Sequence, residues 1–328
     1  MNGDLGIVVI GRNEGERLRR CLESVCRSGM PVVYVDSAST DGSCTVAQSL
    51  GAMVVRLDDG LPLNAARARN EGFEHLLRAV PQTKCVQFVD GDCEIAPGWL
   101  AAGVEALRAD ESLGIVCGRL VERDPRASVY HMLAAIEWDK QPGPLRACGG
   151  IFMARTEAFR KAGGFSSAVL AAEDDDLCIR VRRAGWRIVM LDCQMGVHDL
   201  GPMSFRRWWK RAFRAGHGYA QGMSLHGAGP ERHFVRQTRS ACFWGLMLPL
   251  LAAGLAWPTH GWSFVLLLGY PALALRIWFR TWRRGAGMRE SIWYAVFCVL
   301  AKFPQAFGAL RFWWERFRRR PARLIEYK

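Results

Sequence analysis

The stretch FVDGD, residues 88–92, places two aspartates one residue apart at the end of an apolar run. Carboxylates this close repel each other unless a positive charge lies between them. Asp-Gly is also common in turns, so the stretch alone allows either a turn or a metal site. Mg²⁺ and Mn²⁺ prefer oxygen ligands, and one or two carboxylates suffice when phosphate oxygens complete the coordination shell. Asp90 and Asp92 are therefore the first candidates for binding a cation.

Three further stretches carry polar side chains that could take part in the same chemistry. They are VDSASTDGS (35–43), AARARN (65–70) and EDDDLCIRVRRAGW (173–186). The last begins with four acids, and the helix dipole favours acids at a helix start, so capping explains part of this pattern. Four consecutive acids exceed what a cap needs, because their mutual repulsion costs free energy. We expect some of them to serve another role.

Alternating apolar and amphipathic segments must position these residues. The patterns predict strands at 6–11, 31–36, 52–57 and 84–90, and helices at 13–29, 43–51 and 64–80. Strands that alternate with helices form a parallel sheet with covered faces, and such sheets bind ligands at the carboxyl ends of their strands. Asp36 and Asp90 stand at two such ends.

Charge is divided unevenly along the 328 residues, whose net charge is +13. Residues 1–203 hold 23 Lys and Arg against 27 Asp and Glu, whereas residues 204–328 hold 21 against 4. Because the basic part also holds the longest apolar runs, we expect a membrane as its partner and no nucleic acid. Eleven scattered cysteines without a Cys-x-x-Cys pair, and no secretory signal, indicate reduced thiols facing the cytosol.

The basic part has the pattern of a membrane region. SFRRWWKRAFRAG (204–216) predicts a basic amphipathic helix lying on a membrane, with a helix packed on its own domain as the alternative. Apolar runs predict spans at about 241–258 and 261–279, and a third apolar segment at 291–310 is broken by Lys302 and Pro304.

The positive-inside rule places residues 1–203, the 280–289 loop and the basic tail on the cytoplasmic side. Two crossings satisfy that rule, with 291–310 re-entrant or lying in the interface. Core helices of a soluble domain are the alternative.

Six motifs, in family order, resemble the family 2 glycosyltransferases, which have the GT-A fold. They are VVIGRNE (8–14), VDSASTDGS (35–43), ARNEG (68–72), the D-x-D of residues 90–92, CGGIFMARTEAFRKAGGF (148–165) and EDDDLCIRVRRAG (173–185). The resemblance covers about residues 1–215. It implies an α/β GT-A nucleotide-sugar-binding domain at 1–203 with a central, mostly parallel sheet. A basic interfacial segment at 204–239 and an α-helical membrane region with its tail at 240–328 would follow.

The resemblance also implies roles for single residues. Asp92 would bind a divalent metal, Mg or Mn, with His198 as a candidate further ligand that could equally be structural. The nucleotide sugar would be contacted by Asp36, Arg69, Asp90, Gly149, Gly150 and Glu173. Asp174 would be the base that takes the proton of the acceptor hydroxyl in an inverting transfer. We also expect Gly91 to leave room for a nucleotide.

Some positions depart from the family pattern. Ser37 follows Asp36 where a second acid is common, and Gly11 stands where many members have Pro. The Q-x-x-R-W motif of processive synthases is absent, which argues against a chain-extruding synthase.

The sequence thus predicts a membrane-bound, metal-dependent hexosyltransferase in the inner membrane, with its catalytic domain facing the cytoplasm. It would move a sugar from a nucleotide-sugar donor, expected to be UDP-linked, to a lipid-linked or membrane-proximal glycan acceptor in cell-envelope or exopolysaccharide synthesis. A polyprenyl-phosphate sugar synthase and an inactive membrane scaffold are the alternatives.

Overall fold

The computed structural model describes residues 4–318, and its backbone contacts divide the chain into two units. The N-terminal unit runs to Asp124 and adds Glu137–Val169 and Glu173–Gly201. The C-terminal unit begins at Pro202 and adds 125–136 and 170–172. The division between Gly201 and Pro202 lies close to the expected domain boundary after residue 203. Nothing in the composition marks the two short additions at 125–136 and 170–172.

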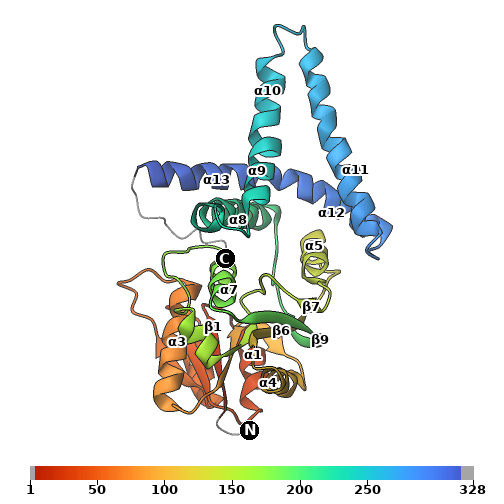
Figure 1. Ribbon diagram of the computed structural model, residues 1–328. Coiled ribbons are helices and arrows are strands. Elements are labelled where there is room, and N and C mark those ends of the chain that lie inside the picture. Colours follow the sequence, from red (N-terminus) through yellow and green to blue (C-terminus); the bar gives the residue numbers. More distant parts are fainter. Residues whose placement is uncertain (1–3, 319–328) are drawn as a thin grey trace. The chain divides into compact units, whose positions relative to one another are not determined.

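Four parallel strands form the first half of the sheet in the N-terminal unit (Figure 1). β1 (Leu5–Gly11) lies between β2 (Val32–Asp36) and β4 (Cys85–Asp90), and β3 (Met53–Arg56) pairs with β2. The first three strands are each followed by a helix, namely α1 (Glu16–Cys26), α2 (Ser43–Ser49) and α3 (Ala65–Ala79). The predicted alternation of strands and helices is therefore confirmed.

The second half of the sheet is mixed. The strand order is β3-β2-β1-β4-β8-β6-β9-β5, and β7 pairs with β9. These later strands are β5 (Cys93–Ile95), β6 (Leu113–Glu122), β7 (Gly143–Pro144), β8 (Phe152–Arg155) and β9 (Arg187–His198). The remaining helices before the C-terminal region are α4 (Trp99–Ala109), α5 (Val129–Trp138), α6 (Thr156–Lys161) and α7 (Glu173–Arg183). Because β9 pairs with β5, its last residue, His198, lies opposite Cys93.

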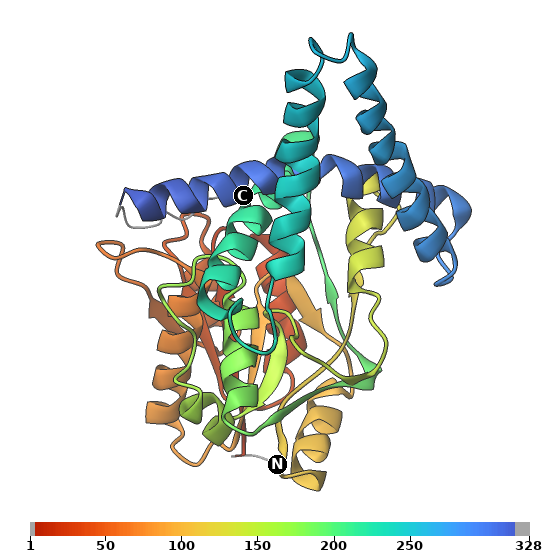
Figure 2. The ribbon, with the colours of Figure 1, turned by 45° about the horizontal axis from the view of Figure 1, so that its top comes forward.

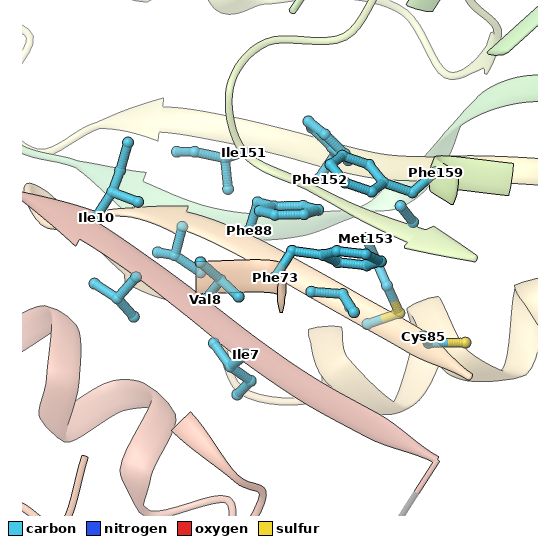
Figure 3. Packing of buried hydrophobic residues seen from close by; sticks show 14 of the residues in the cluster. Ile7, Val8, Ile10, Phe73, Cys85, Phe88, Ile151, Phe152, Met153 and Phe159 are labelled. Atoms are coloured by element: carbon cyan, nitrogen blue, oxygen red, sulfur yellow. The ribbon is translucent and has the colours of Figure 1, made fainter. Parts of the chain in front are cut away.

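Aromatic rings fill the core beside β4. The ring of Phe88 lies 5.2 Å from that of Phe152 and 5.0 Å from that of Phe159, measured between centroids, and Phe73 of α3 lies 4.5 Å from Phe159. Figure 3 shows these four rings together. Burying each such side chain contributes roughly 1.5–3 kcal/mol, so the packing holds the strand that ends at Asp90 firmly in place.

Helices make up most of the C-terminal unit. In chain order they are α8 (Phe205–His226), α9 (Val235–Cys242), the π-helical turn η1 (Phe243–Met247), α10 (Leu248–Gly254), the 3₁₀-helix η2 (Trp262–Leu268), α11 (Gly269–Trp282), α12 (Met288–Leu300) and α13 (Lys302–Phe317). Figures 1 and 2 show α10 and α11 as the two arms of a hairpin and α13 running across its base.

The basic amphipathic helix α8 packs against α13 through glycines. A Cβ atom at Gly216 would collide with the backbone of Gln305, and one at Gly308 would collide with the backbone of Phe213. Helices approach this closely only where a side chain is absent. The alternative expected for this segment was a helix that packs on its own domain. Such packing accounts for one face of α8, while Phe205 at the start of the helix is exposed.

Within residues 4–318, two helices are long and apolar enough to cross a membrane, Trp262–Trp282 and Met288–Phe317. The first coincides with the expected span at 261–279, and the second contains the third apolar segment. The expected span at 241–258 begins near the end of α9, covers η1 and α10, and is not one of these two helices. The part of the basic tail from residue 319 lies outside the described residues.

Candidate active site

The carboxyl ends of β2 and β4 bring Asp36 and Asp90 to either side of the end of β1. Asp36 is only 2% exposed, and its carboxylate accepts hydrogen bonds from the Tyr34 hydroxyl (3.0 Å) and the Ser39 backbone N–H (2.9 Å). The side chain of Asp90 is 34% exposed. Both acids lie at one edge of the sheet, as expected, and Asp90 presents the larger surface to a ligand.

Arg69 connects Asp90 to the acid-rich helix α7. Its Nη2 lies 2.7 Å from Oδ1 of Asp90, and its Nη1 lies 3.0 Å from Oε1 of Glu173. The guanidinium also lies over the ring of Phe165, 5.2 Å from its centroid. Burial lowers the pKa of Arg69, but the neighbouring carboxylates, Asp90 first, outweigh burial and raise it above the usual value. A permanent cation thus offsets the repulsion between acids that are far apart in the sequence.

The residues after Arg69 hold this arrangement in place. Asn70 donates from Nδ2 to the carbonyl of Phe165 (2.7 Å) and accepts the Phe165 N–H at Oδ1 (2.9 Å). Gly72 lies against the sheet, where a Cβ atom would press on Val8 and Val35. The ARNEG motif therefore supplies an ion pair, two hydrogen bonds to the Phe165 backbone and a close helix–sheet contact.

Gly150 has no room for a side chain. A Cβ atom there would collide with Nη2 of Arg69 and would lie 3.3 Å from Oδ2 of Asp90, whereas a Cβ atom at Gly149 would meet nothing within 4 Å. We expect Gly150→Ala to displace the guanidinium from Asp90 and to lower the free energy of unfolding by about 1–3 kcal/mol. Gly149→Ala, the matched control, should change it little. Thermal unfolding of both variants measures the difference, and equal melting temperatures would contradict this explanation.

The acids at the start of α7 lie in different surroundings. Burial and the neighbouring Glu173 carboxylate raise the pKa of Asp174 to about 6. Burial and the charge of Asp174 raise the pKa of Asp175 to about 8. Asp176 instead forms an ion pair with Arg180, whose Nη2 lies 2.6 Å from its Oδ2. Asp174 is therefore a carboxylate that is ionised at neutral pH and can still take up a proton readily.

Asp92 and His198 face each other just beyond the end of β4. Nε2 of His198 lies 3.7 Å from Oδ1 of Asp92, and Nδ1 lies 3.4 Å from Oε2 of Glu122. The Trp138 ring packs edge-on against the imidazole, with centroids 4.5 Å apart, and the Cys93 thiol is close enough to reach the same point. A carboxylate beside an imidazole whose second nitrogen faces another carboxylate is a donor set that fits a divalent cation.

Packing of the chain itself explains Gly91, which we expected to leave room for a nucleotide. A Cβ atom there would lie 3.1 Å from the carbonyl oxygen of Ile10 and 3.3 Å from Cδ1 of Leu18. The Gly91 N–H also donates to the Ile10 carbonyl at 2.8 Å. The glycine lets the D-x-D turn lie against β1 and α1.

Sequence reasoning missed Glu122 and Trp138, and it gave no role to Phe165, the last residue of the motif at 148–165. Glu122 is a buried acid at the end of β6, and an acid at the end of an apolar strand is the signal that marked Asp36 and Asp90. That signal was present in LGIVCGRLVE (113–122). No comparable signal marks Trp138, because its contact with His198 depends on how distant segments pack.

Comparison with known families gives two matches. The model described as "Glycosyl transferase family 2" matches residues 6–163, and the model described as "Glycosyl transferase family group 2" matches residues 123–309. The second match alone spans more than half of the chain.

Two curated relatives, both named pre-mycofactocin glycosyltransferase and from two strains of Mycobacterium tuberculosis, are 27% identical over 212 residues. The match covers 60% of this chain and 43% of each relative, so it spans less than half of their length. Among solved structures, the mannosyltransferase PcManGT from Pyrobaculum calidifontis, in complex with GDP-Man and Mn²⁺, is similar with a TM-score of 0.63 and 21% identity. That similarity covers 96% of this chain and 88% of the other, and it shows a shared GT-A fold.

Proposed function

The chain belongs to the family 2 glycosyltransferases, and on that premise we propose that it is a membrane-bound inverting enzyme acting on a nucleotide sugar. The sugar would pass to a lipid-linked or membrane-proximal acceptor. One observation carries the proposal: the contacts from Asp90 through Arg69 to Glu173 join the D-x-D strand end to the helix start that holds Asp174.

The proposed donor is a nucleoside diphosphate sugar, with UDP as the expected nucleotide. It would lie along the carboxyl edge of β1, β2 and β4, with Asp36 and Asp90 as contacts. Two loops close on each other at this edge: Oδ1 of Asn13 accepts the Thr40 N–H (2.7 Å), and the Gly15 N–H donates to the carboxylate of Asp41 (2.9 Å). The structurally similar PcManGT holds GDP-Man, so a GDP-linked donor is the alternative to be tested.

Asp92 and His198 would hold the divalent cation, Mg²⁺ or Mn²⁺. Their donor atoms face each other, and Glu122 orients the imidazole through Nδ1. When bound, the cation would neutralise the charge that develops on the departing diphosphate. Asp90 stands two residues earlier, but its Oδ1 is paired with Arg69. Asp92 faces the imidazole of His198, so it is the carboxylate proposed to bind the metal, and the similar PcManGT was solved with Mn²⁺.

Asp174 would act as the base. In an inverting transfer the acceptor oxygen attacks the anomeric carbon from the face opposite the leaving group, and its proton must be removed as the new bond forms. A carboxylate with a pKa of about 6 is ionised before attack and accepts that proton. Glu173 would orient the site through Arg69. Gly149, where a Cβ atom would meet nothing within 4 Å, would let the sugar approach the backbone, whereas the space beside Gly150 is taken by Arg69.

A panel of UDP- and GDP-sugars tests the function. Membranes containing the full chain are incubated with each donor and Mn²⁺, and we expect one donor to release nucleotide in step with labelled product in the organic phase. Because the curated relatives are named for pre-mycofactocin, product remaining in the aqueous phase is counted separately. Failure to release nucleotide from any donor at any metal concentration would instead support an inactive scaffold.

The proposed location is the inner membrane, with the catalytic domain facing the cytoplasm and crossings at 241–258 and 261–279. Support comes from apolar side chains exposed on the hairpin, including Leu250 (61%), Trp257 (91%) and Trp262 (78%). Tryptophans at the tip suit a membrane–water interface. Figures 1 and 2 show α13 crossing the hairpin base, which favours the interface for 291–310 over a third crossing.

Two reporter fusions test this topology. A reporter fused after Lys328 should read cytoplasmic, because two crossings return the basic tail to the side of the N-terminal unit. A reporter inserted after Thr259, at the hairpin tip, should read periplasmic and serves as the matched control. A periplasmic signal at Lys328 would mean three crossings.

A further inference from the structure

An open groove of about 590 Å³ lies along the start of the helical run formed by α9, η1 and α10. Most of its lining comes from Arg232, Arg236, Arg239, Ser240, Phe243 and Trp244. Neither the proposed metal site nor the proposed base uses any of these residues. A groove with three arginines and two aromatic rings therefore needs its own explanation.

The lining changes character along the helix. Positions 236, 239 and 243 are three or four residues apart, so they share one face of the helical run. Further along the helical run, the side chains of Met247 and Leu250 are also exposed. At about 1.5 Å per residue, the Cα atoms of Arg236 and Phe243 are about 10 Å apart. A molecule lying along this face meets cations first and apolar side chains afterwards.

The arginines of the groove are available to a ligand. All three are exposed, and none has an ion pair or side-chain hydrogen bond among residues 4–318. In contrast, Arg311 in the same unit is held by Glu315 at 2.7 Å. Residues 204–328 contain only 4 acids against 21 basic residues, so the chain has few carboxylates to offer here. Among the described residues, no carboxylate pairs with these three arginines, so an anionic ligand could pair with them.

We propose that this groove binds one membrane lipid whose head carries a phosphate and a net negative charge. The guanidinium groups of Arg236 and Arg239 would hold the phosphate through paired N–H donors, and Phe243 would lie against the start of the hydrocarbon chain. Free phosphate could make the contacts with Arg236 and Arg239 but not the contact with Phe243. The inference rests on the proposed membrane location of this unit and stands whether or not that lipid accepts the sugar.

Lipid binding to the full chain in detergent tests the proposal. Phosphatidylglycerol and phosphatidylcholine with the same acyl chains are titrated, and bound lipid is counted by native mass spectrometry. We expect phosphatidylglycerol to bind at least about tenfold more tightly than phosphatidylcholine. The double variant Arg236→Gln with Arg239→Gln should weaken the binding of phosphatidylglycerol by about tenfold or more. The variant pair Arg280→Gln and Arg284→Gln removes the same charge elsewhere and should retain it.

Further measurements distinguish a lipid phosphate from free inorganic phosphate. Inorganic phosphate should displace phosphatidylglycerol poorly, and Phe243→Ser should weaken lipid binding without changing the binding of inorganic phosphate. Arg236→Lys with Arg239→Lys keeps the charge but loses the paired N–H donors. This pair should bind phosphatidylglycerol more tightly than the glutamine pair and less tightly than the wild type, which shows that the glutamine pair does not merely unfold the unit. Equal binding of both lipids, or equal loss in the Arg280 and Arg284 pair, would overturn the proposal. Displacement by inorganic phosphate at the affinity of the lipid would overturn it also.

Discussion

Asp174→Asn should lower turnover by about 10²-fold or more while leaving donor affinity nearly unchanged. The amide keeps the size of the side chain and the Oδ1 atom that accepts the Asp175 N–H at 3.0 Å, but it cannot take up a proton. The pairs that Arg69 forms with Asp90 and Glu173 stay in place, so the donor side of the site is preserved. Steady-state turnover and calorimetric donor binding measure the two effects separately.

The same residue should set the pH dependence. The pKa of Asp174 is raised to about 6, so the ionised form that a base requires predominates above that pH and is lost below it. We expect kcat/KM to fall about tenfold per pH unit below 6 and to level off above it. This acid limb should be absent in Asp174→Asn.

Asp175→Asn is the matched control, since it makes the same chemical change one residue away. With a pKa of about 8, Asp175 is largely protonated at neutral pH and is a poor base, so its loss should cost much less. A larger loss in Asp175→Asn would reassign the base. Mild effects in both variants would favour a polyprenyl-phosphate sugar synthase, whose phosphate acceptor needs less help from a base.

Asp92→Ala should abolish metal-dependent donor binding. The variant removes the carboxylate that faces Nε2 of His198 at 3.7 Å, and one imidazole is a weak partner for Mg²⁺ or Mn²⁺. Titration of UDP with and without Mn²⁺ should show that the metal strengthens binding to the wild type and no longer does so in the variant.

Two further variants sharpen this test. Asp192→Ala removes an exposed carboxylate of the same unit, 76% exposed at its side chain, and should leave the metal effect intact. Glu122→Gln should weaken metal affinity by about 10- to 100-fold, because it removes the charge that orients His198. Unchanged affinity of Asp92→Ala for UDP in the presence of Mn²⁺ would contradict the metal assignment.

The first half of the sheet could be predicted because each of its elements is a local pattern. The strand expected at 84–90 is observed at Cys85–Asp90, and the helix expected at 64–80 at Ala65–Ala79. The second half could not be predicted in this way. β8 inserts between β4 and β6 in antiparallel orientation, and β9 pairs with three different strands. Such pairings depend on long-range packing, which no local pattern encodes.

The site shows the same division. Acids that follow apolar strands or open a helix marked Asp36, Asp90 and the four acids at 173–176 as candidates, and the family resemblance singled out Asp174. Glu122 and Trp138 come close to His198 only because three segments of the N-terminal unit that are distant in the sequence meet in three dimensions. The need for a glycine at position 150 could not be explained from the sequence either, since its reason is the guanidinium of Arg69, which another segment supplies.

The most direct test of the central claim is the product formed by wild type and Asp174→Asn side by side. Membranes are supplied with Mn²⁺ and the active donor from the panel, and released nucleotide, labelled product and the anomeric configuration of that product are measured. We expect equal amounts of nucleotide and product from the wild type, a configuration inverted relative to the donor, and at least about 10²-fold less product from the variant. A retained configuration, or a variant as active as the wild type, would contradict a single displacement assisted by Asp174.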